Sequence, residues 1–313
     1  MSVDSPLIHA QNLVKRYGDF VAVNGIDLSV HRGEAFGFLG ANGAGKSTTM
    51  RMIGCVSEPS AGDLTVLGMD TVKQGAEIRA RLGVVPQEDT LDTELTLFEN
   101  LVIYARYFGI KYKVAKARAR ELLEFVQLAD RADKLVDELS GGMKRRLTIA
   151  RALVNEPDVV MLDEPTTGLD PQARHLVWER LFQLKQRGIT IILTTHYMDE
   201  AEQLCDRLVI MDAGRIASEG SPRELIERHV TREVVELRFN GLHTDDLAEI
   251  SAKLDGIDGQ VDPLPDRILL YSDHAETALA EVRARGLEPS SVLERRATLE
   301  DVFLRLTGRR LIE

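Results

Sequence analysis

The stretch Gly40-Ala41-Asn42-Gly43-Ala44-Gly45-Lys46-Ser47-Thr48 decides how this sequence is interpreted. It follows the apolar run Ala35–Leu39 and precedes a segment compatible with a helix, so the predicted order is strand, glycine loop, helix. In this setting the pattern G-x-x-x-x-G-K-[ST] holds nucleotide phosphates. The glycines let several backbone N–H groups point at one anion, and the helix N-terminus adds its positive dipole end. We predict that Lys46 reaches the β- and γ-phosphates and that Ser47 binds Mg²⁺.

The composition is that of a soluble globular protein with room for about two domains. The chain has 313 residues, of which 44% are hydrophobic and 28% are charged. Its longest uninterrupted apolar run, Leu101–Ala105, is far shorter than the roughly 20 residues of a membrane-spanning helix. Met1–Ala10 lacks the pattern of a secretory signal. We therefore expect a cytosolic chain that relies on another polypeptide for any work inside a membrane.

Charge and cysteine usage argue against three further classes: nucleic-acid-binding proteins, disulfide-rich proteins and zinc proteins. The net charge of −11 argues against nucleic acid as a main partner, because proteins that bind nucleic acid carry a basic footprint. Cys55 and Cys205 have no paired spacing, which indicates neither a disulfide framework nor a zinc site.

Short continuous apolar runs alternate with helical patterns, which is typical of a parallel sheet covered by helices on both faces. The strand-length runs are Ala35–Leu39, Val159–Leu162, Ile189–Leu193 and Leu208–Met211. Between about residues 92 and 152 the pattern is helical instead, and Lys111–Arg120 is strongly basic. We interpret this basic run as a solvated helix face, with contact to anionic lipid or a membrane partner as the alternative.

After the linker-like stretch Glu219–Pro222 the pattern changes again. The strands and helices predicted there are, in chain order, Val234–Phe239, Asp245–Leu254, Ile268–Tyr271 and Ala275–Arg285. We therefore predict a nucleotide-binding domain over residues 1–225, with a helical subdomain at about 92–152. A small α+β accessory domain is predicted over residues 226–313.

Polar side chains follow two of the predicted buried strands, at the sheet edge where ligands bind in open α/β folds. Asp163 and Glu164 follow Val159–Leu162, and His196 follows the run that ends at Leu193. We predict that Asp163 holds Mg²⁺ and that Glu164 orients and deprotonates the attacking water. His196 is placed to donate a hydrogen bond to a γ-phosphate oxygen.

Three further signals complete the set. Gln87 follows a short strand candidate, and its amide suits Mg²⁺ or an attacking water. Ser140, Gly141 and Gly142 open a basic helix and form a second anion site that has no lysine loop of its own. This suggests that the γ-phosphate bound there belongs to another subunit. Tyr17 is able to stack on a purine ring, although a single aromatic residue is more often part of a core.

Taken in order, these motifs resemble the ATP-binding cassette (ABC) ATPases over about residues 7–220. The matching parts are the adenine platform Tyr17, the Walker A loop Gly40–Thr48, the glutamine loop at Gln87, the signature segment Leu139–Met143, the Walker B residues Asp163 and Glu164, the loop Gly168–Asp170 and the switch histidine His196. The resemblance implies an α/β P-loop NTPase fold with a mainly parallel sheet core, an antiparallel β subdomain and a helical subdomain.

The same resemblance implies the roles of individual residues. Catalytic roles fall to Glu164, His196, Lys46 and Gln87, and Mg²⁺ is implied to bind near Ser47, Gln87 and Asp163. Contact with ATP is implied for Tyr17, Gly40, Asn42, Gly43, Ala44, Gly45, Lys46, Ser47, Thr48, Gln87, Ser140, Gly141, Gly142, Asp163 and His196. Two copies are implied to face each other head to tail as a homodimer, with ATP between them.

Three longer segments are similar to the ATPase subunits of ABC-2 type exporters: Leu139–Leu147, Asp163–Pro171 and Leu299–Gly308. Among these exporters, the daunorubicin-type drug exporters and the nodulation-factor exporters are most similar. Two further segments, Tyr104–Gly109 and Ala173–Arg180, resemble the nodulation-factor branch in particular. This implies a separate integral membrane ABC-2 permease, a place on the cytoplasmic face of the membrane and a drug-like, lipid-linked or lipo-oligosaccharide cargo. The alternatives are an importer ATPase and a non-transport ABC ATPase acting on ribosomes or DNA.

Overall fold

The computed structural model describes residues 5–239, 250–257 and 259–308. The chain divides into two compact units between Ser221 and Pro222, close to the boundary predicted after residue 225. Among the described residues, no helix combines the length and the apolarity needed to cross a bilayer. The two units are described separately below.

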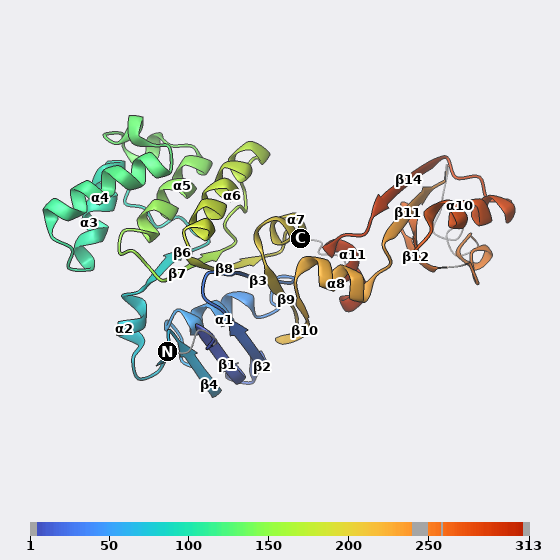
Figure 1. The fold of residues 1–313 in the computed structure, drawn as a ribbon, viewed down its shortest axis with the longest axis horizontal. Coiled ribbons are helices and arrows are strands. Elements are labelled where there is room, and N and C mark those ends of the chain that lie inside the picture. Colours follow the sequence, from blue (N-terminus) through green and yellow to red (C-terminus); the bar gives the residue numbers. More distant parts are fainter. Residues whose placement is uncertain (1–4, 240–249, 258, 309–313) are drawn as a thin grey trace. The chain divides into compact units, whose positions relative to one another are not determined.

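The first unit is built around a six-stranded sheet with the order β10-β9-β3-β8-β7-β6 (Figure 1). Its strands are β3 (Ala35–Leu39), β6 (Leu82–Val85), β7 (Val159–Asp163), β8 (Thr190–Thr195), β9 (Arg207–Asp212) and β10 (Arg215–Gly220). All neighbours pair in parallel except β9 and β10, which form an antiparallel hairpin. The four predicted apolar strands are thereby confirmed.

Both faces of this sheet are buried, and the two-residue period of a strand separates them. Phe36, Phe38 and Met161 point to one face, where they pack with helix α1 (Lys46–Ile53) and the neighbouring antiparallel sheet. Ile191 and Leu193 point to the other face, where they line a small apolar site with α6 (Pro171–Gln186) and α7 (Met198–Leu204). Burial on both faces explains why these strands are continuously apolar.

A second, antiparallel sheet of the first unit has the order β2-β1-β4-β5. Its strands are β1 (Ile8–Tyr17), β2 (Phe20–Val30), β4 (Ala61–Val66) and β5 (Met69–Asp70). A short helix, α2 (Gly75–Arg79), then leads into β6.

The helical part of the first unit contains α3 (Leu97–Tyr107), α4 (Tyr112–Phe125) and α5 (Gly141–Ala152), which share a core of their own. Two short 3₁₀ turns, Ala129–Arg131 and Val136–Glu138, connect α4 to α5. Helix α3 starts with a reciprocal capping box between Thr96 and Glu99. The basic run Lys111–Arg120 lies at the start of α4: Lys111, Lys113 and Arg120 are exposed, Lys116 and Arg118 are partly exposed, and the buried residues of α4 are Ala115, Ala119 and Leu123.

The second unit contains a four-stranded antiparallel sheet with the order β12-β13-β11-β14. Its elements are α8 (Pro222–His229), β11 (Glu233–Arg238), β12 (Gln260–Leu264), β13 (Arg267–Ser272), α10 (Ala275–Ala284), β14 (Ser291–Arg296) and α11 (Leu299–Thr307). The predicted strands at β11 and β13 and the predicted helix at α10 are confirmed. The predicted helix Asp245–Leu254 lies partly outside the described residues.

Candidate nucleotide site

The parallel sheet brings the predicted site residues to one edge. Strands β3, β8, β7 and β6 are adjacent and run in the same direction, so their carboxyl ends align. The glycine loop follows β3, His196 follows β8, Glu164 follows β7, and Gln87 follows β6. Residues far apart in the sequence therefore meet because each ends a strand of the same sheet.

The glycine loop surrounds a cavity of about 350 Å³. The cavity is lined by Phe20, Ala22, Asn42, Gly43, Ala44, Gly45, Lys46, Ser47, Thr48, Gln87 and Glu164. Two of the loop glycines have no room for a side chain, since a Cβ at Gly40 or Gly45 would lie 2.4 or 2.6 Å from a backbone oxygen. Gly45 also has φ +102°, which L residues rarely adopt. The loop thus requires glycine on steric grounds alone, and it ends at the N-terminus of α1.

Lys46 is buried, with 4% of its surface exposed. Its ammonium group donates to the carbonyl oxygens of Gly40 (2.7 Å) and Ala41 (3.1 Å) and to no carboxylate among the described residues. Burial lowers the pKa of Lys46, while the negative charges of Glu164 and Asp163 act in the opposite direction. A buried cation bound only to neutral carbonyls fits a site for an anion.

Ser47 and Asp163 form a pair of oxygen ligands of the kind that Mg²⁺ prefers. Ser47 Oγ donates to Asp163 Oδ1 over 3.2 Å, and Thr194 Oγ1 also donates to Asp163 Oδ1. Ser47, Asp163 and Gln87 line a second cavity of about 430 Å³ next to the first. The oxygen atoms of Ser47, Asp163 and Gln87 therefore fit Mg²⁺, and the hydrogen bond from Thr194 orients the Asp163 carboxylate.

Glu164 lies among neutral hydrogen-bond donors. Its Oε2 accepts from the amide of Gln87 (3.2 Å) and from the hydroxyl of Thr167 (3.1 Å). Its Oε1 lies 3.2 Å from Nδ1 of His196, although the angle does not make this a hydrogen bond. The structure thus places Glu164, Gln87 and His196 together. The carboxylate has no lysine or arginine ion partner among the described residues, which suits a group that must accept a proton.

The signature residues do not line either of these two cavities. Ser140 caps the N-terminus of α5 and accepts from the backbone N–H of Met143 (3.4 Å). Ser140 and Gly141 are exposed, so this helix N-terminus faces outward. Gly142 faces α6, where a Cβ would lie 2.6 Å from the Cβ of Ala173. An anion bound at this helix end would therefore lie outside the cavity of the chain's own glycine loop.

Sequence reasoning selected Tyr17 and missed its neighbour Phe20. The two residues face each other across the β1–β2 turn, but only Phe20 lines the cavity above the glycine loop. Tyr17 is 47% exposed, and its ring lies 5.1 Å from the ammonium of Lys15. Tyr17 ends β1 and Phe20 begins β2, and the sequence alone does not show which of the two aromatic rings faces the glycine loop. Arg145 was also missed, because its role depends on contacts with two distant segments.

Comparison with known proteins agrees with this geometry. A family described as ABC transporter matches residues 23–167, and the C-terminal domain of the nodulation factor export protein NodI matches residues 247–308. The chain is 48% identical over 305 residues to the Nod factor export ATP-binding protein I of Burkholderia orbicola. That match covers 97% of this chain and 98% of the relative.

Solved structures give the same fold for the first unit. The chain is similar to cbiO1 of Clostridium perfringens, part of an ABC transporter complex, with a TM-score of 0.67 and 30% identity. That match covers 72% of this chain and 92% of the other. It is also similar to the ATP-binding cassette MJ0796 in a dimeric post-hydrolysis state bound to ADP and Pi. Here the TM-score is 0.63 with 27% identity, and the match covers 68% of this chain and 98% of the other.

Proposed function

This chain belongs to the ABC transporter ATPases, in the family of the Nod factor export ATP-binding proteins, and from this premise we propose that two copies of it enclose ATP and drive an export permease. Members of this family bind and hydrolyse ATP to power transport. The proposal adds the arrangement of the site, the dimer and the permease contact. The observation that carries it is the outward-facing signature segment, which lies apart from the chain's own nucleotide cavity.

Each residue of the cavity has a role that its contacts support. Lys46 exchanges the carbonyls of Gly40 and Ala41 for the β- and γ-phosphates. Ser47, Gln87 and Asp163 would hold Mg²⁺, and the ion would neutralise charge on the phosphates. Glu164 takes the proton of the attacking water, and Gln87 holds the carboxylate in place. His196, beside Glu164, donates to the γ-phosphate and so responds to its presence.

A head-to-tail homodimer completes this site. Ser140, Gly141 and the N-terminus of α5 supply the anion-binding groups that the chain's own cavity lacks, and they are exposed for a partner. Two copies that each carry a net charge of −11 repel one another. Nucleotide with Mg²⁺ between them therefore supplies the attraction, and hydrolysis of the γ-phosphate removes it.

The substitution Glu164→Gln tests the dimer and the base together. We expect it to lower single-turnover ATP hydrolysis by about 100-fold or more, because a positioned base contributes about 10²–10⁴ in rate. ATP binding stays intact, so the variant accumulates as a dimer with MgATP in size-exclusion chromatography. Glu94→Gln, an amide substitution at an exposed position of the same unit, is the control and leaves both properties unchanged. A Glu164→Gln protein that stays monomeric with MgATP would falsify the proposal.

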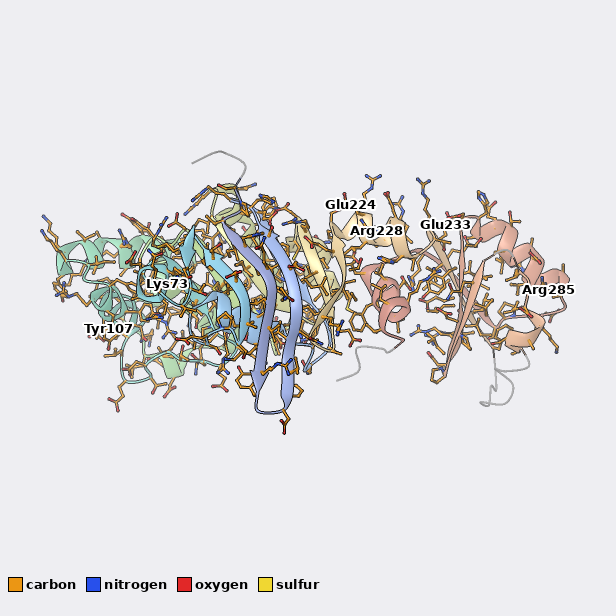
Figure 2. All side chains as sticks on the ribbon, turned by 90° about the horizontal axis from the view of Figure 1, so that it is seen from below. Lys73, Tyr107, Glu224, Arg228, Glu233 and Arg285 are labelled. Atoms are coloured by element: carbon orange, nitrogen blue, oxygen red, sulfur yellow. The ribbon has the colours of Figure 1, made fainter. Side chains whose placement is uncertain are left out.

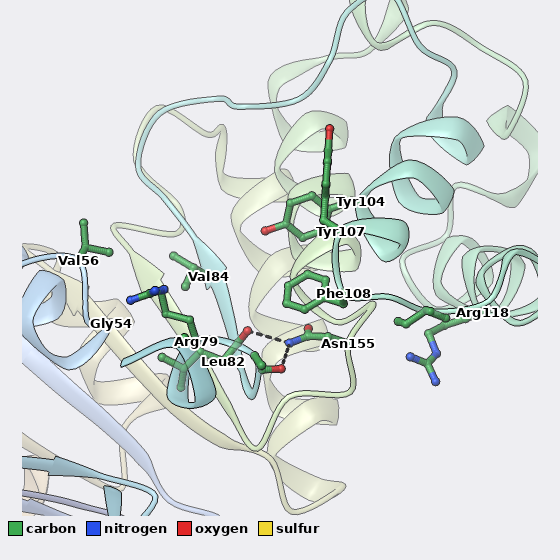
Figure 3. A pocket seen from close by; sticks show the side chains of 13 residues that line it. Gly54, Val56, Arg79, Leu82, Val84, Tyr104, Tyr107, Phe108, Arg118 and Asn155 are labelled. Atoms are coloured by element: carbon green, nitrogen blue, oxygen red, sulfur yellow. Dashed lines mark hydrogen bonds between the residues drawn. The ribbon is translucent and has the colours of Figure 1, made fainter. Parts of the chain in front are cut away.

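A groove beside the glutamine loop supports docking of the separate ABC-2 permease. The groove has a volume of about 640 Å³ and runs between β6 and the end of α3, with Val56 and Val84 on one side and Tyr104, Tyr107 and Phe108 on the other (Figure 3). Asn155 closes one end of the groove by donating to the carbonyls of Ala80 and Leu82.

Two features of this groove favour a protein partner. Val56 is 72% exposed and Tyr107 is 80% exposed, which is unusual for neighbouring large apolar side chains. Tyr107 is marked at the surface of the helical part in Figure 2. The groove shares Val56 and Val84 with the cavity of Gln87, so a partner seated there would move with the nucleotide site.

The pair Tyr107→Asp and Tyr112→Asp tests this surface. Both tyrosines are exposed residues of the helical part, but only Tyr107 lines the groove. We expect Tyr107→Asp to abolish co-purification with the permease from detergent-solubilised membranes, while ATP hydrolysis by the isolated chain stays normal. Tyr112→Asp should retain the permease. Equal retention by both variants would place the permease elsewhere.

A chain that docks on the permease in this way lies on the cytoplasmic face of the cell membrane. We propose export as the direction of transport, by similarity to the Nod factor export proteins. By similarity to the Nod factor export proteins, a lipo-oligosaccharide is the cargo class that we propose, ahead of a drug-like or lipid-linked molecule. The acidic net charge disfavours the alternative of a ribosome- or DNA-associated ATPase. Co-purification of the permease rather than ribosomes or DNA distinguishes these functions.

A further inference from the structure

The turn that carries Glu164 is strained. Glu164 has φ +46°, in the left-handed region that non-glycine residues rarely adopt. Such a conformation is unfavourable for a residue with a side chain and persists only where surrounding contacts hold it. The backbone N–H of Glu164 donates to the carbonyl of Thr194 (3.1 Å), which holds the turn from the side of β8. Within the turn, the carbonyl of Glu164 accepts from the backbone N–H of Thr167 over 3.4 Å, a long hydrogen bond that leaves room for a second donor.

Arg145, in the second turn of α5, provides that donor. Its Nε donates to the carbonyl of Pro165 (2.7 Å), and its Nη2 donates to the carbonyls of Asp163 (2.9 Å) and Glu164 (3.0 Å). One guanidinium therefore binds three consecutive carbonyls around the strained residue. The N–H donors of a guanidinium are fixed in one plane, so one arginine can bind several carbonyls at once, whereas a lysine ammonium is a single point charge.

The same guanidinium also reaches the glutamine loop. Its Nη1 donates to the carbonyl of Pro86, the residue before Gln87. The side chain of Gln87 in turn donates to Glu164 (3.2 Å). Arg145 thus holds the backbone at Glu164 and the backbone next to Gln87 at the same time. In the sequence these two segments are separated by the helical part of the first unit.

Arg145 is only partly exposed, and its bonding argues for more than packing. Burial lowers the pKa of Arg145 to about 10, which still leaves the group charged at neutral pH. Among the described residues it forms no ion pair, and all of its hydrogen bonds go to neutral carbonyls. The negative charges of Glu200, Asp163, Asp89 and Glu164 act in the opposite direction and raise the pKa, but a partly buried guanidinium is still costly to desolvate unless hydrogen bonds compensate. Its hydrogen bonds to the Glu164 turn and to the start of the glutamine loop indicate a positioning role.

We propose that Arg145 is a positioning residue for ATP hydrolysis, which holds the Glu164 turn and the start of the glutamine loop in the geometry needed for catalysis. This inference rests on the proposed role of Glu164. It predicts a loss that is concentrated in the chemical step, since the side chain of Arg145 hydrogen-bonds to neither Lys46 nor the exposed signature residues.

The test compares Arg145→Gln with Arg146→Gln in the full-length chain. Arg146 is the matched control, because it is the next residue of α5, is buried and donates to the carbonyls of Val126 (2.7 Å) and Gln127 (3.4 Å) at the end of α4. We expect Arg145→Gln to lower single-turnover hydrolysis of MgATP by about 100-fold, the range for a displaced base. The dissociation constant for MgATP should change by less than about threefold.

Two further results separate positioning from a general structural effect. Arg146→Gln should lower the melting temperature by as much as Arg145→Gln but keep hydrolysis within about threefold of the unmodified chain. Arg145→Lys keeps the positive charge but lacks the planar set of donors, so it should restore less than about a tenth of the hydrolysis rate lost in Arg145→Gln. Equal hydrolysis rates in Arg145→Gln and Arg146→Gln, or full activity in Arg145→Lys, would overturn the proposal.

A double-mutant cycle with Glu164→Gln gives the sharpest readout. If Arg145 acts through Glu164, Arg145→Gln should lower the residual rate of the Glu164→Gln protein by less than about twofold, since residues that act as a unit are not additive. The double variant should still dimerise with MgATP. Additive losses overturn the role of Arg145 alone, whereas a Glu164→Gln protein with normal hydrolysis overturns the proposed function first.

Discussion

The nucleotide site of the first unit and a charge cluster in the second unit both bury charged side chains, but they hold them differently. We call Glu236, Arg267, Arg295 and Asp301 the accessory charge cluster. In it, Arg295 donates to Asp301 (2.7 and 2.8 Å) and to Glu236 (2.7 Å), and Arg267 also donates to Glu236 (2.9 Å). Each carboxylate oxygen of the cluster therefore has a cationic donor.

In the nucleotide site, by contrast, neutral groups hold the charges. Lys46 is bound to carbonyls, Glu164 to an amide and a hydroxyl, and Arg145 to carbonyls. Such partners can be exchanged for a phosphate or a water without separating an ion pair. The difference indicates that the accessory charge cluster stabilises its unit, whereas the nucleotide site keeps its charges available for a ligand.

The largest expected effect on stability comes from a substitution that breaks the accessory charge cluster. Asp301 is 1% exposed and also accepts from Thr298 and from the hydroxyl of Tyr271. Asp301→Ala leaves Arg295 buried with half of its partners, so we expect the free energy of unfolding of this unit to fall by about 3–5 kcal/mol. Urea unfolding of the full chain, followed at both units, measures it, and ATP binding should be unchanged.

A double variant is the control for this prediction. Arg295→Met with Asp301→Leu removes both charges, and we expect it to be less destabilising than Asp301→Ala alone, because no unpaired charge stays buried. If the double variant were less stable than Asp301→Ala, the packing of these side chains would contribute more to stability than their ion pair.

The second prediction concerns Lys46 and has the opposite pattern. Lys46→Met removes a buried charge that has no ion partner, so we expect the free energy of unfolding to stay equal or to rise slightly. ATP affinity should fall by roughly 100-fold, the worth of a strong charge-assisted hydrogen bond. An equilibrium titration with MgATP measures this, with the exposed Lys134→Met as control. Affinity within about threefold of normal would exclude Lys46 from the phosphate site.

The third prediction uses pH to separate the two units. Burial raises the pKa of Glu200, against the hydrogen bonds from Thr195, Thr166 and Trp178. The folded first unit then holds a proton that the unfolded chain releases, so its stability falls as pH rises above the ordinary carboxyl value of 4.5. Thermal unfolding across this range should show the slope, and Glu200→Gln should flatten it.

The accessory charge cluster should respond to pH with the opposite sign. Burial acts to raise the pKa of Asp301, but the hydrogen bonds from Arg295 and Thr298 outweigh it, and the net pKa is lowered. Its contribution is therefore present above the ordinary value of 3.8 and is lost as pH falls through the lowered value in the folded protein. A second unit that gains stability on acidification below that value would contradict this assignment.

The smallest expected effect is at an exposed ion pair. Lys134 and Glu138 lie 2.9 Å apart on the surface of the helical part, with about half of each side chain exposed. Lys134→Ala should change the free energy of unfolding by only about 0.3–0.5 kcal/mol, and high salt should remove the difference. A loss above 1 kcal/mol, measured by urea unfolding, would show that exposure is a poor guide to charge energetics here.

Much of the first unit was predictable from local pattern. Strands β3, β7, β8 and β9 each contain a continuous run of three or more apolar residues, because both faces of the sheet are covered, and that pattern is visible in the sequence. The glycine loop is equally local, since its spacing and its left-handed glycines are properties of one short segment. In the second unit β12 and β14 were not predicted, as their residues are only partly buried and do not alternate clearly.

The amino-acid sequence by itself determined the glycine loop, the buried parallel strands and the order of the residues that follow them, because each depends on neighbours within a few positions. Only the tertiary structure decided that Phe20 rather than Tyr17 lines the cavity, and that Arg145 grips the turn of Glu164. It also decided that Glu200 is buried with a raised pKa. These features depend on which segments pack together, and the energy of a buried charge or a strained residue is set by those contacts rather than by the local sequence.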